Sequence, residues 1–414
     1  MHKITFLVLL IILSSCVPFR TIKYGSPSID DYKIFEQEQV ENANNKFYFV
    51  EKDAQKKMLD TLKLDVYFEK SDTFKQLTLD EVLEYIRKPV AAIIIKNDTI
   101  LYEQYKGGLD KCSQTTIFSV TKTVTSLLCG IALKEGYIRG LNDFVIDYIP
   151  ELKDADKKFA SLTIEHLLDM SAGLKFKESY GWNPFSKIAR LYYGDNSFNA
   201  IRDVKFMNEP GKRYHYDSMT TAILGLLIER AVGVSYAQYL SEKLWKPLGM
   251  EQSASISLDS KKSHIAKSYA GLTTNVRDLA KIGRLYLNKG NWNGVQIIDT
   301  AYVERSHSKN MVGENNRPYS YSWYWGTSDH KKFSNLDSLY TFYKNQTNIE
   351  VCGAYRNRET GKYEAIIHRG GFWAYGLYGQ VLYMNTKKNY IAVFLGADRI
   401  EDFYNIFDRL FENL

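Results

Sequence analysis

Ser119 and Lys122 stand three residues apart at the start of an apolar run, in the segment TTIFSVTKTVTSLLCGIALKEGYI (residues 115–138). Residues i and i+3 of a helix share a face, so a helix here would bring the Ser119 hydroxyl within hydrogen-bond reach of the Lys122 amine. A buried lysine must find partners or lose its proton, and a desolvated amine can accept the hydroxyl proton. The serine then becomes a nucleophile, and the helix N-terminus offers partial positive charge to an oxyanion. The pair therefore predicts nucleophilic attack on a carbonyl carbon.

Two other Ser-x-x-Lys matches occur, Ser306 with Lys309 and Ser328 with Lys331. Both lie in polar sequence, which predicts loops with solvated lysines. After Ser119, in contrast, the residues are apolar nearly all round, which predicts a buried helix ended by Gly136. This difference in setting favours Ser119 as the reactive serine.

Two further segments could complete a site. In PGKRYHYDSMTTAILG (residues 210–225), Tyr216 and Ser218 stand in a turn just before an apolar helix. In HRGGFWAYGLYGQVLYM (residues 368–384), small residues precede a strong strand pattern, so a substrate could lie against the strand with a backbone N–H aimed at its carbonyl. The chain has no G-x-S-x-G motif, and His166 and His215 are interpreted as lying outside the site.

Five segments in order resemble the family of serine β-lactamases and penicillin-binding proteins, over roughly residues 85–414. They are FSVTK (118–122), LTIEHLLDMSAGLKF (162–176), YDS (216–218), RDLAKIGRLYLNKGNWNGVQII (277–298) and WAYGLYGQVLYM (373–384). Within the family, the chain is most similar to class C-like enzymes, family VIII esterases and 6-aminohexanoate-dimer hydrolases. We therefore expect a serine hydrolase of the S-x-x-K type.

The resemblance implies a role for each candidate residue. Ser119 would form an acyl-enzyme, Lys122 would accept its proton, and Tyr216 would pass a proton to the leaving group and later activate water. Ser218 would bond Lys122 or the substrate. The N–H groups of Ser119 and Leu377, the latter next to Gly376, would form the oxyanion hole. Tyr180, in FKESYGW, resembles a cleft tyrosine of the hydrolase branch, and a packed aromatic is the alternative interpretation.

This sequence departs from the family pattern at two places. Ser218 stands where β-lactamases have asparagine, and residues 374–376 (Ala-Tyr-Gly) stand where they have Lys-Thr-Gly. In β-lactamases and peptidases that lysine helps to hold the substrate carboxylate, so its absence favours amides or esters without that group. A rival alignment places residues 368–370 (His-Arg-Gly) opposite Lys-Thr-Gly, and Arg369 could then bind an anion. A peptidoglycan D-Ala peptidase or β-lactamase, and a binding protein without turnover, remain alternatives.

The N-terminus predicts export. A basic start precedes a ten-residue apolar run, Ile4–Leu13, which is too short to span a bilayer and fits a signal peptide. The run ends in Leu13-Ser14-Ser15-Cys16, which resembles the bacterial lipobox, so residues 1–15 are interpreted as a signal peptide and Cys16 as a lipidated first residue. An ordinary cleaved signal is the alternative. The expected location is the bacterial cell envelope, with the protein anchored to a membrane.

Along the chain, strand patterns lie at both ends and helical patterns fill the middle. We expect residues 16–75 to be a tether and an N-terminal extension, and residues 76–414 to be the catalytic domain, with a helical insertion at about 140–290. The expected fold is α+β and β-lactamase/transpeptidase-like, with an antiparallel sheet assembled from both ends and flanked by helices. The charge of +6 is scattered, which argues against a nucleic-acid partner, and no residue cluster indicates a metal or cofactor. The expected partners are a small amide or ester, or a cell-wall peptide, and the membrane.

Overall fold

The computed structural model describes residues 17–52, 59, 62–68, 73–84, 88, 90–179, 183–307, 319–325, 329–345, 350–356, 361–368 and 371–397. The predicted signal peptide, Cys16, Tyr180 and Arg369 lie outside this part of the chain.

The central sheet is built from both ends of the chain, as predicted. Its eight strands run in the order β12 (Tyr319–Ser320), β13 (Trp323–Trp325), β17 (Gly371–Gly376), β18 (Gln380–Asn385), β19 (Tyr390–Gly396), β5 (Val90–Lys96), β6 (Thr99–Lys106) and β2 (Val50–Glu51). All neighbours are antiparallel except β2 and β6. Asn97 and Asp98 both have positive φ (49° and 59°), which suits the tight turn of a two-residue hairpin between β5 and β6.

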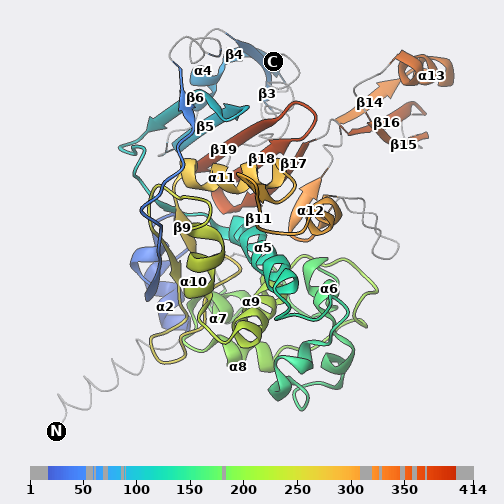
Figure 1. Ribbon diagram of the computed structural model, residues 1–414. Helices are drawn as coiled ribbons and strands as arrows, with labels where there is room; N and C mark the ends of the chain where they lie inside the picture. The colour runs from blue at the N-terminus through green and yellow to red at the C-terminus, as the bar shows by residue number, and fades with distance from the viewer. Residues whose placement is uncertain are drawn as a thin grey trace.

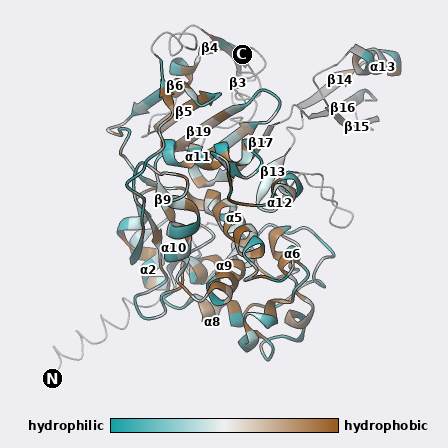
Figure 2. Ribbon diagram, viewed as in Figure 1, coloured by the Kyte–Doolittle hydropathy of each residue, from teal (hydrophilic) through white to brown (hydrophobic). Residues whose placement is uncertain are grey.

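Helices cover the sheet and fill the middle of the chain (Figure 1). The central helix is α5 (Thr121–Lys134), whose residues 121–132 are all buried. Figure 2 shows hydrophobic residues along α5 and α9 (Ser218–Val232). Gly233, with φ of 74°, ends α9, and a 78° bend separates α9 from the helical segment Tyr236–Trp245, which begins with α10 (Tyr236–Leu240). In the described part of the chain no single helix is long and apolar enough to cross a membrane, although this bent pair meets that test together.

The predicted helical insertion needs correction at its far end and in its content. It contains α6 (Ile164–Leu168), α7 (Lys187–Tyr193) and α8 (Ser197–Arg202), as expected of a helical region. It also contributes β8 (Ala254–Ser257) and β9 (Leu272–Thr274) to a four-stranded sheet with β1 (Gln37–Val40) and β7 (Thr115–Thr116). Helix α11 (Val276–Leu287) packs on the central sheet instead, because Gly283 lets Ile391 approach closely.

Residues 17–51, expected to belong to a tether and an N-terminal extension, form a folded extension and no tether. This extension forms α2 (Val17–Tyr24), then β1 and β2, each paired within a sheet. Phe35, Val40 and Phe49 are buried in the same hydrophobic core as α5. These few buried side chains are spread through a polar sequence, which is why the pattern did not indicate them. Because they are part of the core, the folded domain begins well before residue 76.

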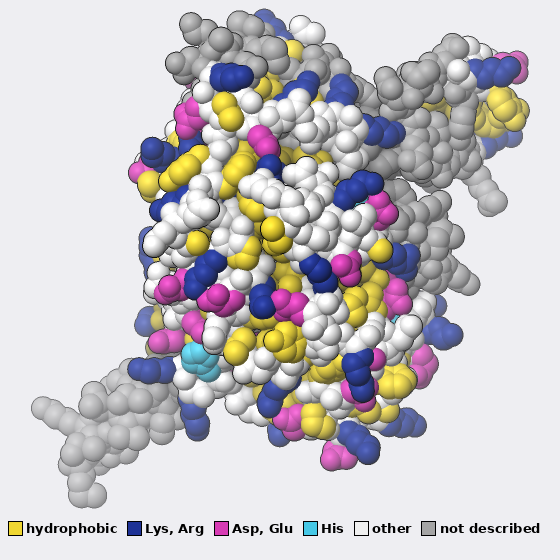
Figure 3. Space-filling view, viewed as in Figure 1, with side chains coloured by type: hydrophobic (Ala, Val, Ile, Leu, Met, Phe, Trp, Pro, Cys, Tyr) yellow, Lys and Arg dark blue, Asp and Glu magenta, His cyan; other side chains and the backbone are white. Residues whose placement is uncertain are grey.

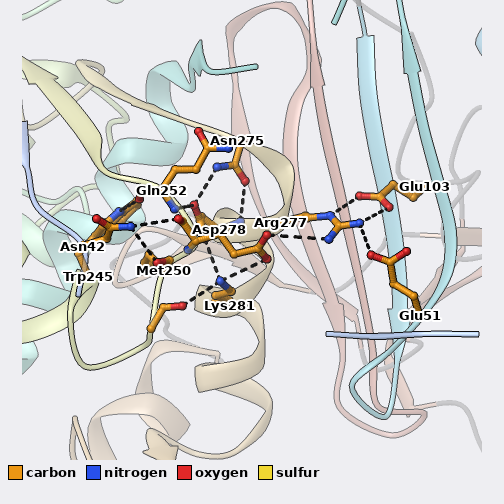
Figure 4. Close-up of polar contacts among 12 residues, drawn as sticks. Asn42, Glu51, Glu103, Trp245, Met250, Gln252, Asn275, Arg277, Asp278 and Lys281 are labelled. Carbon is orange, nitrogen blue, oxygen red and sulfur yellow. Dashed lines mark hydrogen bonds and ion pairs between the residues drawn. The ribbon is translucent and has the colours of Figure 1, made fainter. Parts of the chain in front are cut away.

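A network of charges, buried except at Glu51, links this extension to α11 (Figure 4). Arg277 donates hydrogen bonds to Glu103 on β6 and to Glu51 on β2. One turn further, Lys281 donates to Asp278 at 2.9 Å and lies 3.5 Å from Glu251. The segment RDLAK, which contributed to the family resemblance, therefore has a structural role here.

A small unit stands apart from the central sheet at the upper right of Figure 1. It comprises β14 (Asp329–Phe333), β15 (Glu350–Arg356) and β16 (Tyr363–His368), with α13 (Leu336–Asn345). On the described part of the face shown in Figure 3, basic and acidic side chains are intermingled.

Candidate active site

Ser119 lies in a short 3-10 turn, η3 (Phe118–Val120), immediately ahead of α5. Backbone hydrogen bonds hold the preceding residues, with Ile117 N–H donating to the Leu272 carbonyl at 2.9 Å. Phe118 has φ of 46°, a left-handed conformation that is unusual for a bulky residue and is often found at functional sites. The turn leaves Ser119 half-buried at the N-terminus of a buried helix.

Lys122 is 1% exposed, and its ammonium nitrogen has three acceptors. It donates to Ser119 Oγ at 2.9 Å, to Ser218 Oγ at 3.1 Å and to the Tyr269 carbonyl at 2.9 Å. The predicted contact between Ser119 and Lys122 is confirmed. Burial lowers the pKa of Lys122 to about 8, against the opposing influence of the Glu178 and Asp217 carboxylates. An amine with this pKa is partly neutral near physiological pH, as a proton acceptor must be.

Tyr216 lies beside Lys122, and its catalytic role stays a prediction. The Lys122 nitrogen lies 5.2 Å from the centroid of the Tyr216 ring. The Tyr319 ring meets the Tyr216 ring edge to face, with 5.9 Å between their centroids. The Tyr324 ring stacks on the Tyr216 ring, with 6.4 Å between their centroids. The next residue, Asp217, caps α9 by accepting a hydrogen bond from the Thr220 N–H. The cap and the aromatic neighbours together hold Tyr216 beside the amine.

Glu178 is a site residue that sequence reasoning missed. Its carboxylate accepts two hydrogen bonds from Ser218, one from Oγ at 2.7 Å and one from the backbone N–H at 2.9 Å. Ser218 therefore links Lys122 to a carboxylate. No spacing pattern connects positions 178 and 218, and the available signal was the nearness of Glu178 to Tyr180 in FKESYGW.

Asp217 is a buried carboxyl close to the half-buried Glu178. It is 1% exposed, and burial raises its pKa to about 7, with the charge of Glu178 adding to the effect. The amine of Lys122 thus has two carboxyl groups in its surroundings but bonds directly to hydroxyl and carbonyl oxygens.

The end of β17 reaches the turn that carries Ser119. A side chain at Gly376 would place its Cβ 2.5 Å from the Ile117 carbonyl oxygen, so glycine is required for this approach. The ring centroids of Phe118 and Tyr378 lie 5.7 Å apart in an edge-to-face arrangement. Gln380 braces the turn at residues 377–379, because its side-chain amide donates to the Leu377 carbonyl at 3.1 Å and accepts from the Gly396 N–H at 3.2 Å. Leu377 therefore adjoins the nucleophile, and its oxyanion role stays a prediction.

This placement favours one of the two alignments of the chain with the Lys-Thr-Gly segment of β-lactamases. Residues 374–376 end β17 beside Ser119, whereas His368 ends β16 in the separate three-stranded unit. We therefore retain the alignment in which Ala-Tyr-Gly replaces Lys-Thr-Gly.

The other Ser-x-x-Lys matches differ from the predicted loops. Ser306 is buried as the last residue of α12 (Thr300–Ser306), where its hydroxyl donates to the Val303 carbonyl, and Lys331 lies on β14. Lys309 and Ser328 fall outside the described residues.

Both singled-out histidines have partners away from Ser119. His166 completes a capping box with Thr163 at the start of α6, and a ring nitrogen of His215 bonds the Phe176 carbonyl. Within the described residues, no group of three or more His, Cys, Asp or Glu side chains could hold a metal ion.

The chain is similar in sequence to known proteins. The chain is 25% identical over 229 residues to 6-aminohexanoate-dimer hydrolase of Paenarthrobacter ureafaciens, covering 52% of this chain and 56% of that protein. It is 26% identical over 308 residues to protein flp of Staphylococcus aureus (strain MW2), covering 64% and 60%. The chain therefore spans less than two thirds of the length of these relatives.

Solved structures share the fold. A putative 6-aminohexanoate-dimer hydrolase from Bacillus anthracis superposes with a TM-score of 0.71 at 20% identity, covering 93% of this chain and 92% of that one. A class C beta-lactamase gives a TM-score of 0.52 at 14% identity, covering 80% and 92%. The family model described as Beta-lactamase matches residues 76–409. The chain therefore belongs to the beta-lactamase family, a family of serine hydrolases.

Proposed function

We propose that this protein cleaves a small amide or ester through an acyl-enzyme on Ser119. The observation that carries the proposal is the buried amine of Lys122, bonded at once to the hydroxyls of Ser119 and Ser218. A serine hydroxyl is a weak nucleophile until a nearby base accepts its proton. Lys122 is such a base, because burial lowers its pKa to about 8.

Each step assigns a proton to a named group. In acylation, Ser119 Oγ attacks the carbonyl carbon while its proton moves to the neutral amine of Lys122. The negative oxygen that forms would accept hydrogen bonds from the N–H groups of Ser119 and Leu377. The bond to the leaving group then breaks, and Tyr216, beside Lys122, returns the proton to the departing nitrogen or oxygen. A water molecule, deprotonated through the same groups, attacks the acyl carbon and releases the acid and Ser119.

Residues 374–376, which replace the Lys-Thr-Gly of β-lactamases, support a substrate without a carboxylate next to the reacting bond. Residues 374–376 end β17 at the site, and the lysine that would hold such a carboxylate in β-lactamases is absent there. Similarity to a protein named 6-aminohexanoate-dimer hydrolase is consistent with an amide substrate.

The test combines labelling and turnover. A fluorophosphonate probe should label the wild-type protein on Ser119, because only an activated serine reacts with it. Turnover of p-nitrophenyl esters, amino-acid amides and nitrocefin should then be measured side by side. We expect hydrolysis of esters or amides and little of nitrocefin. Rapid nitrocefin turnover, or labelling by fluorescent penicillin, would favour the β-lactamase or peptidase alternative, and absence of any labelling would favour a binding protein.

We also propose that Cys16 anchors the protein to a membrane of the cell envelope through a lipid. The sequence Leu13-Ser14-Ser15-Cys16 supports this proposal. Helix α2 begins at Val17, the next residue, so the anchor would hold the folded body close to the lipid surface. Cys16→Ala should move the protein from the membrane fraction to the soluble fraction of the envelope. An unchanged distribution, together with no incorporation of a palmitate analogue into the wild type, would refute the anchor.

A further inference from the structure

The carboxylate of Glu178 fixes the direction of a hydrogen bond next to Lys122. It accepts from the Ser218 N–H at 2.9 Å and from the Ser218 hydroxyl at 2.7 Å. Ser218 is the first residue of α9, so this N–H belongs to a helix N-terminus, which is a favourable place for a negative charge. A carboxylate only accepts hydrogen bonds, so the single proton of the Ser218 hydroxyl points to Glu178. Toward Lys122, the Ser218 oxygen is therefore left as an acceptor.

The other two oxygens bonded to the Lys122 nitrogen differ in what they can do. The Tyr269 carbonyl, at 2.9 Å, can only accept, whereas the Ser119 hydroxyl, also at 2.9 Å, can donate or accept. A neutral amine has two N–H groups and one lone pair. Its N–H groups must then be directed to Ser218 and Tyr269, because both of these oxygens accept only. The lone pair is left to face Ser119, whose hydroxyl donates to it.

Without the carboxylate, this arrangement would lose its direction. The Ser218 hydroxyl, 3.1 Å from the Lys122 nitrogen, could then donate its proton to the lone pair of the amine. An N–H of the amine would face Ser119 instead, and the Ser119 oxygen would accept it. A serine that accepts from the amine cannot pass its own proton to that amine, so it would stay a weak nucleophile.

Resting on the proposed function, we propose that Glu178 is a positioning residue that acts through Ser218 and orients the lone pair of neutral Lys122 toward the Ser119 hydroxyl. In acylation the proton of Ser119 becomes the third N–H of Lys122, while Glu178 neither gains nor loses a proton. A serine at position 218 can donate or accept, and the carboxylate removes that ambiguity.

Glu178→Gln tests the direction of this bond with little change of shape. The Ser218 N–H can only donate, so the oxygen of the new amide accepts from it, and the amide NH₂ faces the Ser218 hydroxyl. That NH₂ also only donates, so the Ser218 proton turns toward Lys122. We expect kcat at about pH 9, where Lys122 is mostly neutral, to fall about ten- to a hundredfold, the scale of one hydrogen bond to a charged group. KM should change little, and fluorophosphonate labelling of Ser119 should slow by the same factor as kcat.

A double-mutant cycle with Ser218→Ala tests whether Glu178 acts through this hydroxyl. Ser218→Ala removes the group that Glu178 orients. In that background Glu178→Gln should lower kcat further by less than about twofold. A purely structural role of Glu178 would lower the free energy of unfolding and would not depend on the Ser218 hydroxyl.

Asp217→Asn is the matched comparison for the loss of a nearby charge. The Asp217 carboxyl also raises the pKa of Lys122, but it accepts from the Thr220 N–H at 2.7 Å. Asparagine is a good helix cap, so the start of α9 should be kept. This variant should shift the pH profile in the same direction as Glu178→Gln and lower kcat at high pH much less.

Glu178→Ala provides a second variant should Glu178→Gln not fold. Glu178 is half-buried, so formate should enter the space left by its side chain, accept from the Ser218 hydroxyl and restore part of kcat.

The outcomes separate the two proposals. Full kcat and labelling in Glu178→Gln, or an equal loss with and without the Ser218 hydroxyl, overturns the positioning role while Ser119 remains the nucleophile. Failure of formate to raise kcat of Glu178→Ala also counts against that role. Absence of turnover and of fluorophosphonate labelling in the wild type overturns the proposed function instead.

Discussion

Two lysines on buried helices of this molecule have opposite surroundings. Lys122 on α5 is 1% exposed and Lys281 on α11 is fully buried. Lys281 bonds directly to the carboxylate of Asp278 and lies near that of Glu251 (Figure 4). Lys122 bonds directly to two hydroxyls and a carbonyl, with carboxylates one group further away. A buried amine that bonds a carboxylate forms an ion pair that holds the structure together, whereas one that bonds neutral oxygens can exchange a proton when its pKa is lowered by burial.

The largest effect is expected at the hydroxyl bonded to Lys122. Ser119→Ala should lower kcat by a factor on the order of 10⁶, as in other serine hydrolases, because it removes the attacking atom. Hydrolysis of the best ester measures the loss. Ser126→Ala is the matched control, since this serine lies on the same helix and bonds Tyr302 instead. Retained turnover in Ser119→Ala would remove the nucleophile assignment.

Replacing Lys122 tests whether its role is chemical. Lys122→Met should lower kcat by about 10²–10⁴, the usual contribution of general acid–base catalysis. The free energy of unfolding at pH 7 should stay near the wild-type value. Burial lowers the pKa of Lys122 from 10.5 to about 8, so this lysine weakens folding at neutral pH, and that cost disappears as pH rises through 8 toward 10.5. Removing Lys122 also removes this cost, which offsets the loss of its hydrogen bonds to Ser119, Ser218 and Tyr269.

The same substitution at Lys281 should have the opposite outcome. Lys281→Met leaves Asp278 and Glu251 buried with one cation fewer, so we expect a loss of about 3 kcal/mol in the free energy of unfolding. Urea denaturation measures it, and kcat of the folded fraction should change by less than about threefold. Were Lys122→Met the less stable of the two, the contrast between the lysines would be wrong.

The smallest effect concerns the pH profile. In the wild type, kcat/KM should rise with pH and level off above about 8, because the neutral amine of Lys122 is the active form. The charge of Glu178 raises the pKa of Lys122, so Glu178→Gln should shift this rise to lower pH. Glu165→Gln, which removes a carboxylate that bonds Arg305, serves as the control. A shift to higher pH would contradict the assigned influence of Glu178.

Local patterns predicted the parts of the fold that depend on near neighbours. The buried helix after Ser119 and the contact of Ser119 with Lys122 both follow from spacings of a few residues. The resemblance to a family added Tyr216 and the end of β17. The extension escaped prediction, because a few core residues such as Phe35 and Val40 are spread through polar sequence and their pairing partners lie far along the chain.

The sequence by itself determined that a serine and a lysine share one face at the start of a buried helix. Only the tertiary structure decided what surrounds that lysine. Its bonds to Ser218 and Tyr269 join residues 96 and 147 positions apart, and Glu178 reaches it through Ser218. Helical periodicity extends over a few residues, whereas the pKa of a buried amine depends on every charge and dipole that folding brings near it.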